Sequence, residues 1–108
     1  MSVVSKLKTV RDVLTQVTEN VFHYEAENKN GPYIVWMEDG EGDSLHLNDK
    51  KNEQVITGTV DLFTKDEYDQ LIDDIQNALS GADISFILNS VQYEEETEFI
   101  HYEWRFEI

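Results

Sequence analysis

The sequence predicts an α+β fold, with two amphipathic helices packed on a mostly antiparallel sheet in the order α-β-β-β-α-β-β. Two observations carry this prediction. Apolar residues recur at steps of three and four in two separate segments, as they do in helices with one buried face. The remaining segments alternate, or are rich in β-branched and aromatic residues, as strands are. With 108 residues, the whole chain (1–108) is expected to form a single domain.

A first helix is predicted close to the N-terminus. One face carries an apolar stripe, and the other carries lysines, an arginine and an aspartate. The β-branched members of the stripe lower the intrinsic helix propensity, so contacts with the rest of the protein must stabilise this helix. The stripe consists of Val3, Leu7, Val10, Leu14, Val17 and Val21.

Two short β-favouring runs follow, at residues 21–26 and 33–37. Between them, the Asn-Gly-Pro sequence at 30–32 favours a turn, so the simplest arrangement is a hairpin. From 38 to 53 no hydrophobic period is present, and acidic residues, glycines and paired lysines predict a loop of about fifteen residues. Loops of that length in compact domains are usually functional or mobile.

A core strand and the second helix occupy the middle of the chain. The strand is predicted over 54–63, with Gly58 marking a bulge or a close approach of another backbone. Thr64 fits the N-cap of the helix, Glu67 completes a capping box, and Gly81 ends the helix. The apolar face of this helix contains Tyr68, Leu71, Ile72, Ile75 and Leu79.

The last two strands are predicted at 84–93 and 99–108, on either side of an acidic tip at 94–98. Strict alternation in the final strand separates an apolar face from a charged one, and the apolar face is assigned to the core. That face carries Ile100, Tyr102, Trp104, Phe106 and Ile108.

Charge and composition exclude several functions. The chain has 23 acidic and 8 basic residues and a formal net charge of −15. Nucleic-acid binding gains its free energy from Lys and Arg that release counterions, so no sequence-specific nucleic-acid partner is expected. No stretch approaches the ~20 apolar residues that cross a bilayer, and no export signal is evident, so we expect a soluble cytoplasmic product without a membrane partner. Cysteine is absent, which excludes disulfides and thiolate chemistry.

A repeated His-Tyr-Glu tripeptide is the main candidate for metal or acid/base chemistry. On strands, it could bring His23, Glu25, His101 and Glu103 together as metal ligands or as an acid/base set. Solvent-facing polar positions explain the same residues more simply. We therefore expect no metal ion, no cofactor and no catalytic residue at this set.

The acidic run at 38–43 has part of the pattern of a calcium-binding loop. Asp39, Glu41 and Asp43 recur at alternate positions, but Ser44 replaces the turn glycine and Lys50 stands where the bidentate glutamate belongs. A flexible acidic loop or a partner contact is the better interpretation. Because the sequence also has no nucleophile elbow and no glycine-rich phosphate loop, we do not expect an enzyme.

Three segments resemble small tail-completion, or tail-terminator, proteins of long-tailed siphophages and prophages. They are residues 32–40 (PYIVWMEDG), residues 58–64 (GTVDLFT) with the helix that follows, and residues 89–97 (NSVQYEEET) with 101–107 (HYEWRFE). The resemblance implies an α+β subunit of a hexameric ring that caps the tail tube, stops its growth and presents a docking surface to the head. It places the protein in the virion tail, and in the host cytoplasm during assembly.

The resemblance also implies partners: other copies of the chain, the tail tube protein, and a head-tail connector or neck protein. An acidic bore would not grip the phosphates of a passing genome, so the acidic character fits such a ring. Eight acidic residues are expected at assembly, lumen or partner surfaces. They are Glu38, Asp39, Glu41, Asp43, Glu94, Glu95, Glu96 and Glu98.

Two alternatives stay open. Another head-tail joining (neck) protein would share the fold and the acidity, and differ only in its position in the particle. A monomeric acidic inhibitor that mimics DNA would use the same carboxylates to occupy the site of a basic protein.

Overall fold

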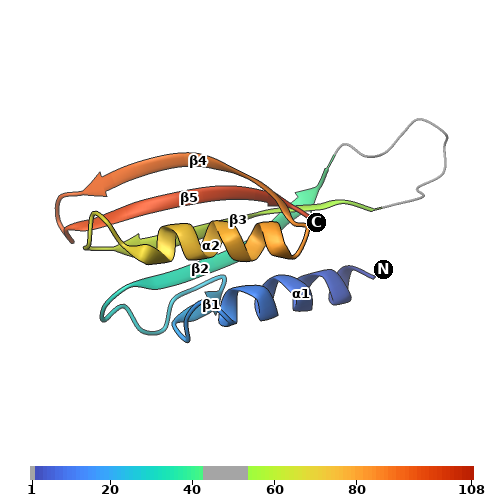
Figure 1. Cartoon of the computed structure of the whole chain (residues 1–108), viewed down its shortest axis with the longest axis horizontal. Coiled ribbons are helices and arrows are strands. Elements are labelled where there is room, and N and C mark those ends of the chain that lie inside the picture. Colours follow the sequence, from blue (N-terminus) through green and yellow to red (C-terminus); the bar gives the residue numbers. More distant parts are fainter. Residues whose placement is uncertain (1, 43–53) are drawn as a thin grey trace.

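The computed structural model describes residues 2–42 and 54–108 (Figure 1). Their order is α-β-β-β-α-β-β, so the predicted α+β class is confirmed. The elements are α1 (Val3–Thr15), β1 (Val21–His23), β2 (Tyr33–Glu41), β3 (Ile56–Thr64), α2 (Gln70–Gly81), β4 (Ser85–Glu94) and β5 (Phe99–Glu107).

The five strands form one sheet in the order β1-β2-β3-β5-β4. β2, β3, β5 and β4 pair antiparallel, whereas β1 runs parallel to β2, with Val21 opposite Ile34. The predicted hairpin between 21–26 and 33–37 is therefore wrong. β1 ends at His23, and Tyr24 adopts a left-handed φ of 76°, so the connection returns to the start of β1 before β2 begins.

β2 is longer than the sequence predicted. Residues 38–41 were assigned to a loop, but they continue the pairing with β3 as far as Glu41 opposite Ile56. The register shifts between Glu38 and Gly40, which leaves Asp39 as an extra residue in β2. This end of the strand has exposed acidic side chains and therefore no hydrophobic alternation. The rest of the predicted loop, 43–53, lies outside the described residues.

Both helices pack on one face of the sheet, where β3 and β5 supply the centre of the core (Figure 1). The even-numbered residues of β3, from Ile56 to Thr64, are all buried. In β5, Trp104 and Phe106 are buried as predicted, and the indole Nε1 of Trp104 donates to Gln76 Oε1 at 2.9 Å. The other core residues include Val10, Leu14, Ile34, Ile75, Leu79 and Ile84.

The ends of both helices differ from the predictions. α1 ends at Thr15, earlier than predicted, although Val17 and Val21 still pack against the core. The N-cap of α2 is Asp69, whose side chain accepts from the Leu71 amide at 2.9 Å, so the predicted cap at Thr64 is wrong.

Thr64 is instead the last residue of β3, opposite Ile100. Its hydroxyl donates to Asp69 Oδ2 at 2.6 Å, which holds the cap in place. Strand pairing of Thr64 thus prevents the predicted capping box with Glu67, and Tyr68 lies before the helix with 84% of its surface exposed. Gly81 ends α2, as predicted.

A buried lysine connects α1 to the sheet. Lys6 is only 9% exposed, and its Nζ donates to the backbone carbonyls of Gln54 and, at 3.2 Å, Ile108. Ile108 also exchanges two backbone hydrogen bonds with Ile56. Lys6 therefore joins the first turn of α1 to the place where β3 begins and β5 ends.

Gly58 is required by close packing in the middle of the sheet. A Cβ atom at this position would lie 2.3 Å from the Met37 carbonyl oxygen and 2.6 Å from the Phe106 ring. The first contact is with backbone, which cannot move away as a flexible side chain can. The predicted close approach at Gly58 is confirmed.

We expect Gly58→Ala to destabilise the protein by about 1–3 kcal/mol, the usual range for overpacking. The matched control is Gly81→Ala, where a Cβ atom meets nothing within 4 Å at the end of a helix. The control should be neutral, or stabilising by up to about 1 kcal/mol. Urea unfolding followed by far-UV circular dichroism measures both. Equal stability of the two variants would contradict the packing argument.

Candidate functional site

The face of the sheet opposite the helices is the main candidate surface, and is called the open face here. Strand register assigns to it the odd-numbered residues of β3 and β5 and their neighbours on β2. The β3 members are partly exposed, in contrast to the buried even-numbered ones. Its central members are Val35, Met37, Thr57, Thr59, Asp61, Phe63, His101, Glu103 and Arg105.

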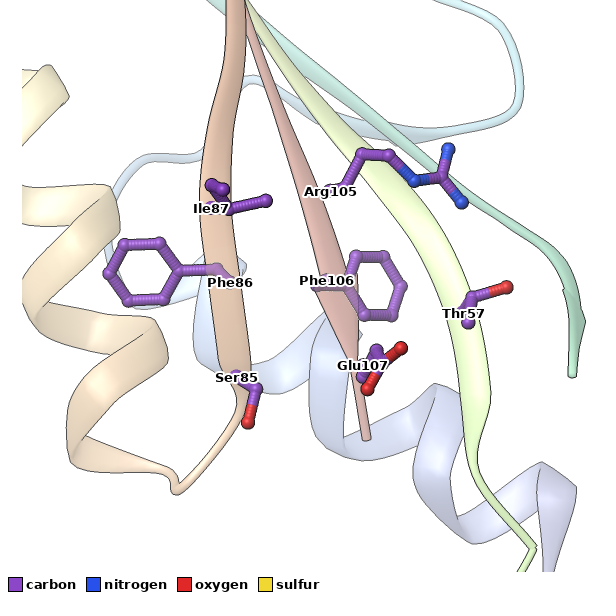
Figure 2. Close-up of a pocket in the computed structure, with 7 residues that line it drawn as sticks. All are labelled: Thr57, Ser85, Phe86, Ile87, Arg105, Phe106 and Glu107. Carbon is purple, nitrogen blue, oxygen red and sulfur yellow. The ribbon is translucent and has the colours of Figure 1, made fainter. Parts of the chain in front are cut away.

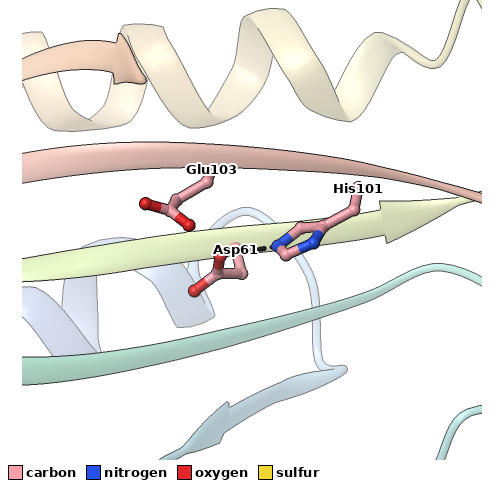
Figure 3. Close-up of side chains that lie close together, drawn as sticks. All are labelled: Asp61, His101 and Glu103. Carbon is pink, nitrogen blue, oxygen red and sulfur yellow. Dashed lines mark hydrogen bonds and ion pairs between the residues drawn. The ribbon is translucent and has the colours of Figure 1, made fainter. Parts of the chain in front are cut away.

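His101 lies at the centre of a polar cluster on the open face (Figure 3). Its Nε2 is 2.7 Å from Asp61 Oδ1, and its Nδ1 is 3.9 Å from Glu94 Oε2. Its ring stacks on Phe63 at a centroid distance of 4.2 Å. Glu103, which lies opposite Asp61 in the strand pairing, accepts a hydrogen bond from Asn89 Nδ2 at 3.0 Å.

The hydrogen bond with Asp61 raises the pKa of His101 above its ordinary value of 6.5. Partial burial acts in the opposite direction, and the negative charges of Asp61, Glu94 and Glu103 add to the increase. The cluster therefore favours the imidazolium form, which donates a hydrogen bond to Asp61 on β3 and forms a longer ion pair with Glu94 on β4.

Three side chains of this cluster could hold a divalent cation. One ligand atom each from Asp61, His101 and Glu103 lies within 4.8 Å of the others. However, His101 Nε2 already shares a hydrogen bond with Asp61, so a metal ion would have to replace the proton in it. The arrangement supports a charged hydrogen-bond network directly, and a metal ion only at the expense of that network.

The predicted four-residue set is not brought together. His23 is opposite Trp36, which is buried on the helix-covered face, and stacks on it at 3.9 Å. His101 is opposite Phe63 on the open face, so the two histidines lie on different sides of the sheet. His101 and Glu103 of the predicted set lie together with Asp61, and Glu25 lines the same groove as His101 without belonging to this cluster. The sequence could not identify Asp61 as this partner, because only the strand order and the register place its carboxylate beside His101 and Glu103.

Glu38, one of the predicted surface acids, has partners of its own. Its carboxylate accepts from the Tyr24 hydroxyl and lies 2.7 Å from His23 Nε2. Partial burial opposes its ionisation, but these hydrogen bonds outweigh that effect and lower the pKa of Glu38. The same hydrogen bond raises the pKa of Tyr24. Glu38 thus helps to hold the residues that follow β1.

A second polar contact lies beside a groove of about 320 Å³ at the end of β5 (Figure 2). Asp39 accepts from Thr57 Oγ1 at 2.7 Å and pairs with Arg105 Nη2 at 3.0 Å. The Thr57 hydrogen bond and the Arg105 charge lower the pKa of Asp39 against a smaller effect of burial. The groove is lined by Thr57, Ser85, Phe86, Ile87, Arg105, Phe106 and Glu107.

The predicted acidic surface residues form two separate groups. Glu38, Asp39 and Glu41 lie near the end of the sheet where β2 ends and β3 begins. Residues 95–98 form the turn between β4 and β5 at the opposite end, directly after Glu94, the last residue of β4 (Figure 1). There Glu95, Glu96 and Glu98 are exposed, while Glu94 accepts from Thr97 Oγ1 at 3.1 Å. Asp43 lies outside the described residues.

Sequence reasoning missed an apolar surface along β4. Ile87, Leu88, Val91 and Tyr93 are exposed in this strand at the margin of the sheet. The available signal was the run of residues 85–93, which contains no charged residue in a strongly acidic chain. The sequence did not show that β4 lies at the margin of the sheet. The last strand in the chain, β5, is inserted between β3 and β4, and the order of strands in the chain does not reveal this.

None of the helices in the described segments 2–42 and 54–108 has the length and apolar character of a membrane-spanning helix.

Comparison with known proteins identifies a shared fold but no family. No family model matches the chain, and no curated protein matches it. Among solved structures, it is similar to a chain described as "Virion of native gene transfer agent (GTA) particle", with a TM-score of 0.54 and 12% sequence identity. The match covers 94% of this chain and 87% of that one. The chain therefore has, over nearly its whole length, a fold that also occurs in a virion particle.

The hydrogen bond between His101 and Asp61 predicts a pH-dependent part of the stability. Because the pKa of His101 is higher in the folded state than in the unfolded state, this contribution is fully present below pH 6.5. It is lost as the pH rises through the folded-state pKa. Asp61→Asn should therefore lower the free energy of unfolding by roughly 1–2 kcal/mol at about pH 5.5, and by less at pH 8.5 and above.

Urea unfolding of wild type and Asp61→Asn at a series of pH values measures this difference. Asn89→Ala is the control, since it removes a hydrogen bond to Glu103 but leaves the His101–Asp61 contact in place. A difference between wild type and Asp61→Asn that stays constant across this pH range would contradict the assignment.

Proposed function

We propose that this chain is a structural protein of a phage-type virion that caps the tail tube as a ring of six. In this role it ends tail elongation and provides the docking surface for the head. The observation that carries the proposal is the fold shared with the gene transfer agent virion chain, which extends over 94% of this chain. The sequence resemblance to tail-terminator proteins supports the same role, with residues 1–108 acting as one domain.

The charge distribution supports a ring around a DNA conduit. Six copies would carry about −90 formal charges, six times −15. The exposed acids of the β4–β5 turn, Glu95, Glu96 and Glu98, project from one end of the sheet. Facing a bore or a neighbouring virion protein, these carboxylates would repel the phosphates of passing DNA.

The shape of the molecule favours assembly over catalysis. Its extents are 48 × 23 × 23 Å, and the groove beside Arg105 lies on the surface of the sheet. That groove is lined by side chains of β3, β4 and β5, and the Asp61–His101–Glu103 cluster is engaged in hydrogen bonds within the sheet. The proposed partners are therefore proteins: other copies of the chain, the tail tube protein, and the connector or neck protein above it.

Deleting the gene from its phage or induced prophage tests the role. We expect overlong tails that lie free beside DNA-filled heads, because nothing would stop tube growth or receive the head. Negative-stain measurement of tail length and head attachment gives the result, and complementation with the intact gene is the control. Tails of normal length without heads would favour a neck protein. Normal particles would contradict both and favour the DNA-mimic inhibitor.

Charge reversal at the β4–β5 turn tests the acidic surface. We expect Glu95→Lys/Glu96→Lys to reduce the yield of complete virions at least about tenfold, because it replaces repulsion of phosphate by attraction. Glu19→Lys/Glu27→Lys is the matched control, with the same change of charge at exposed positions on other segments. Plaque or transduction titres measure the yield. Equal titres for the two double variants would rule out a special role of the turn.

A further inference from the structure

β4 has a free edge. It is the last strand in the order β1-β2-β3-β5-β4, and it pairs with β5 from Ser85 opposite Glu107 to Glu94 opposite Phe99. In the part of the chain that the structure describes, no strand pairs with its other edge (Figure 1). The outward-pointing N–H and C=O groups of an edge strand can pair with a strand of another chain.

Apolar side chains are exposed on both faces of this strand. Ile87, opposite Arg105, lies on the open face and is 66% exposed. On the helix-covered side, Leu88, Val91 and Tyr93 are 43%, 49% and 61% exposed, so α2 does not cover them. Four large apolar side chains gathered along one strand form a surface that is usually associated with protein contacts.

The charge of β4 favours a second copy of this chain as the partner. Two copies with a formal charge of −15 each repel one another, and the repulsion is smallest where their contact surface is uncharged. Residues 85–93 contain no charged residue. They also contain no lysine or proline, which natural proteins place on edge strands to prevent pairing.

We propose that the free edge of β4 is the surface on which a second copy of this chain docks. The inference rests on the proposed ring and adds the position of the contact between its subunits. In a cyclic ring, each copy must present two different surfaces. The opposite margin of the sheet provides the second one, since the three-residue β1 covers β2 only from Ile34 to Trp36. Within the described residues, no strand pairs with this margin at residues 37–40, and we assign it to the neighbouring copy.

The two margins are compatible in charge. The edge of residues 37–40 carries Glu38 and Asp39, whereas the edge of β4 is uncharged up to Tyr93. An uncharged edge placed against an acidic one avoids the repulsion that two acidic edges would produce. Tyr24, which is 54% exposed beside β1, adds an aromatic surface at the acidic margin.

Sedimentation velocity of the purified full chain tests the inference, at about 0.1 M and about 0.5 M NaCl because salt screens the repulsion. Wild type should associate, and more so at high salt. Ile87→Lys/Val91→Lys should weaken the association at least about tenfold, because two lysines on the edge oppose strand pairing. Val4→Lys/Tyr68→Lys is the matched control: it makes the same charge change at two other exposed apolar residues, and should associate like wild type.

Circular dichroism and the thermal midpoint establish that each variant is folded. If Ile87→Lys/Val91→Lys does not fold, the variant Ser90→Lys/Tyr93→Lys is used in its place, because it adds the same two charges to the same strand. Association of the β4 variant equal to wild type would overturn the β4 contact but leave the ring possible through another surface.

A wild type that stays monomeric at every salt concentration would overturn docking of a second copy. The length of the tails made after deletion of the gene would still test the proposed tail-capping function independently. Binding of such a monomer to purified tail tubes, abolished by the β4 substitutions, would assign the edge to the tube protein instead.

Discussion

The rest of the structure depends on burial of the helix-covered side of β3 and β5, with Trp104 at its centre. Trp104 is opposite Val60 on one side and Leu88 on the other, and it is fully buried. Replacing a buried tryptophan in such a position by alanine costs about 3–5 kcal/mol, a large part of the stability of a domain this size. Burial of the polar indole N–H does not reduce this stabilisation, because the N–H donates a hydrogen bond to Gln76 Oε1 on α2.

This core explains why one face of the sheet is left for other uses. Both helices cover the apolar side chains of the central strands, so the opposite face is left partly exposed and carries polar as well as apolar residues. There, Asp61 on β3 pairs with His101 on the neighbouring β5, and Asp39 on β2 pairs with Arg105 on β5 across β3. These pairs compensate locally for an acidic surface without removing the net charge of −15.

The acidity and the apolar margin of β4 are consistent with one another. A strongly charged surface keeps copies of a protein apart, so association requires a place where the charge is low. The distribution of residues provides this: acids gather at the two ends of the sheet, and β4 is uncharged between them. This distribution makes the margin of β4 the place where two copies would repel one another least.

By itself, the sequence determined the α+β class, the order of the elements, the close approach at Gly58 and the buried face of β5. These follow from hydrophobic period and local steric rules, which act within one segment. Only the tertiary structure decided the parallel pairing of β1, the cap at Asp69, the meeting of Asp61 with His101 and the marginal position of β4. Each of these depends on which strands become neighbours and in what register, and that is set by packing between segments far apart in the chain.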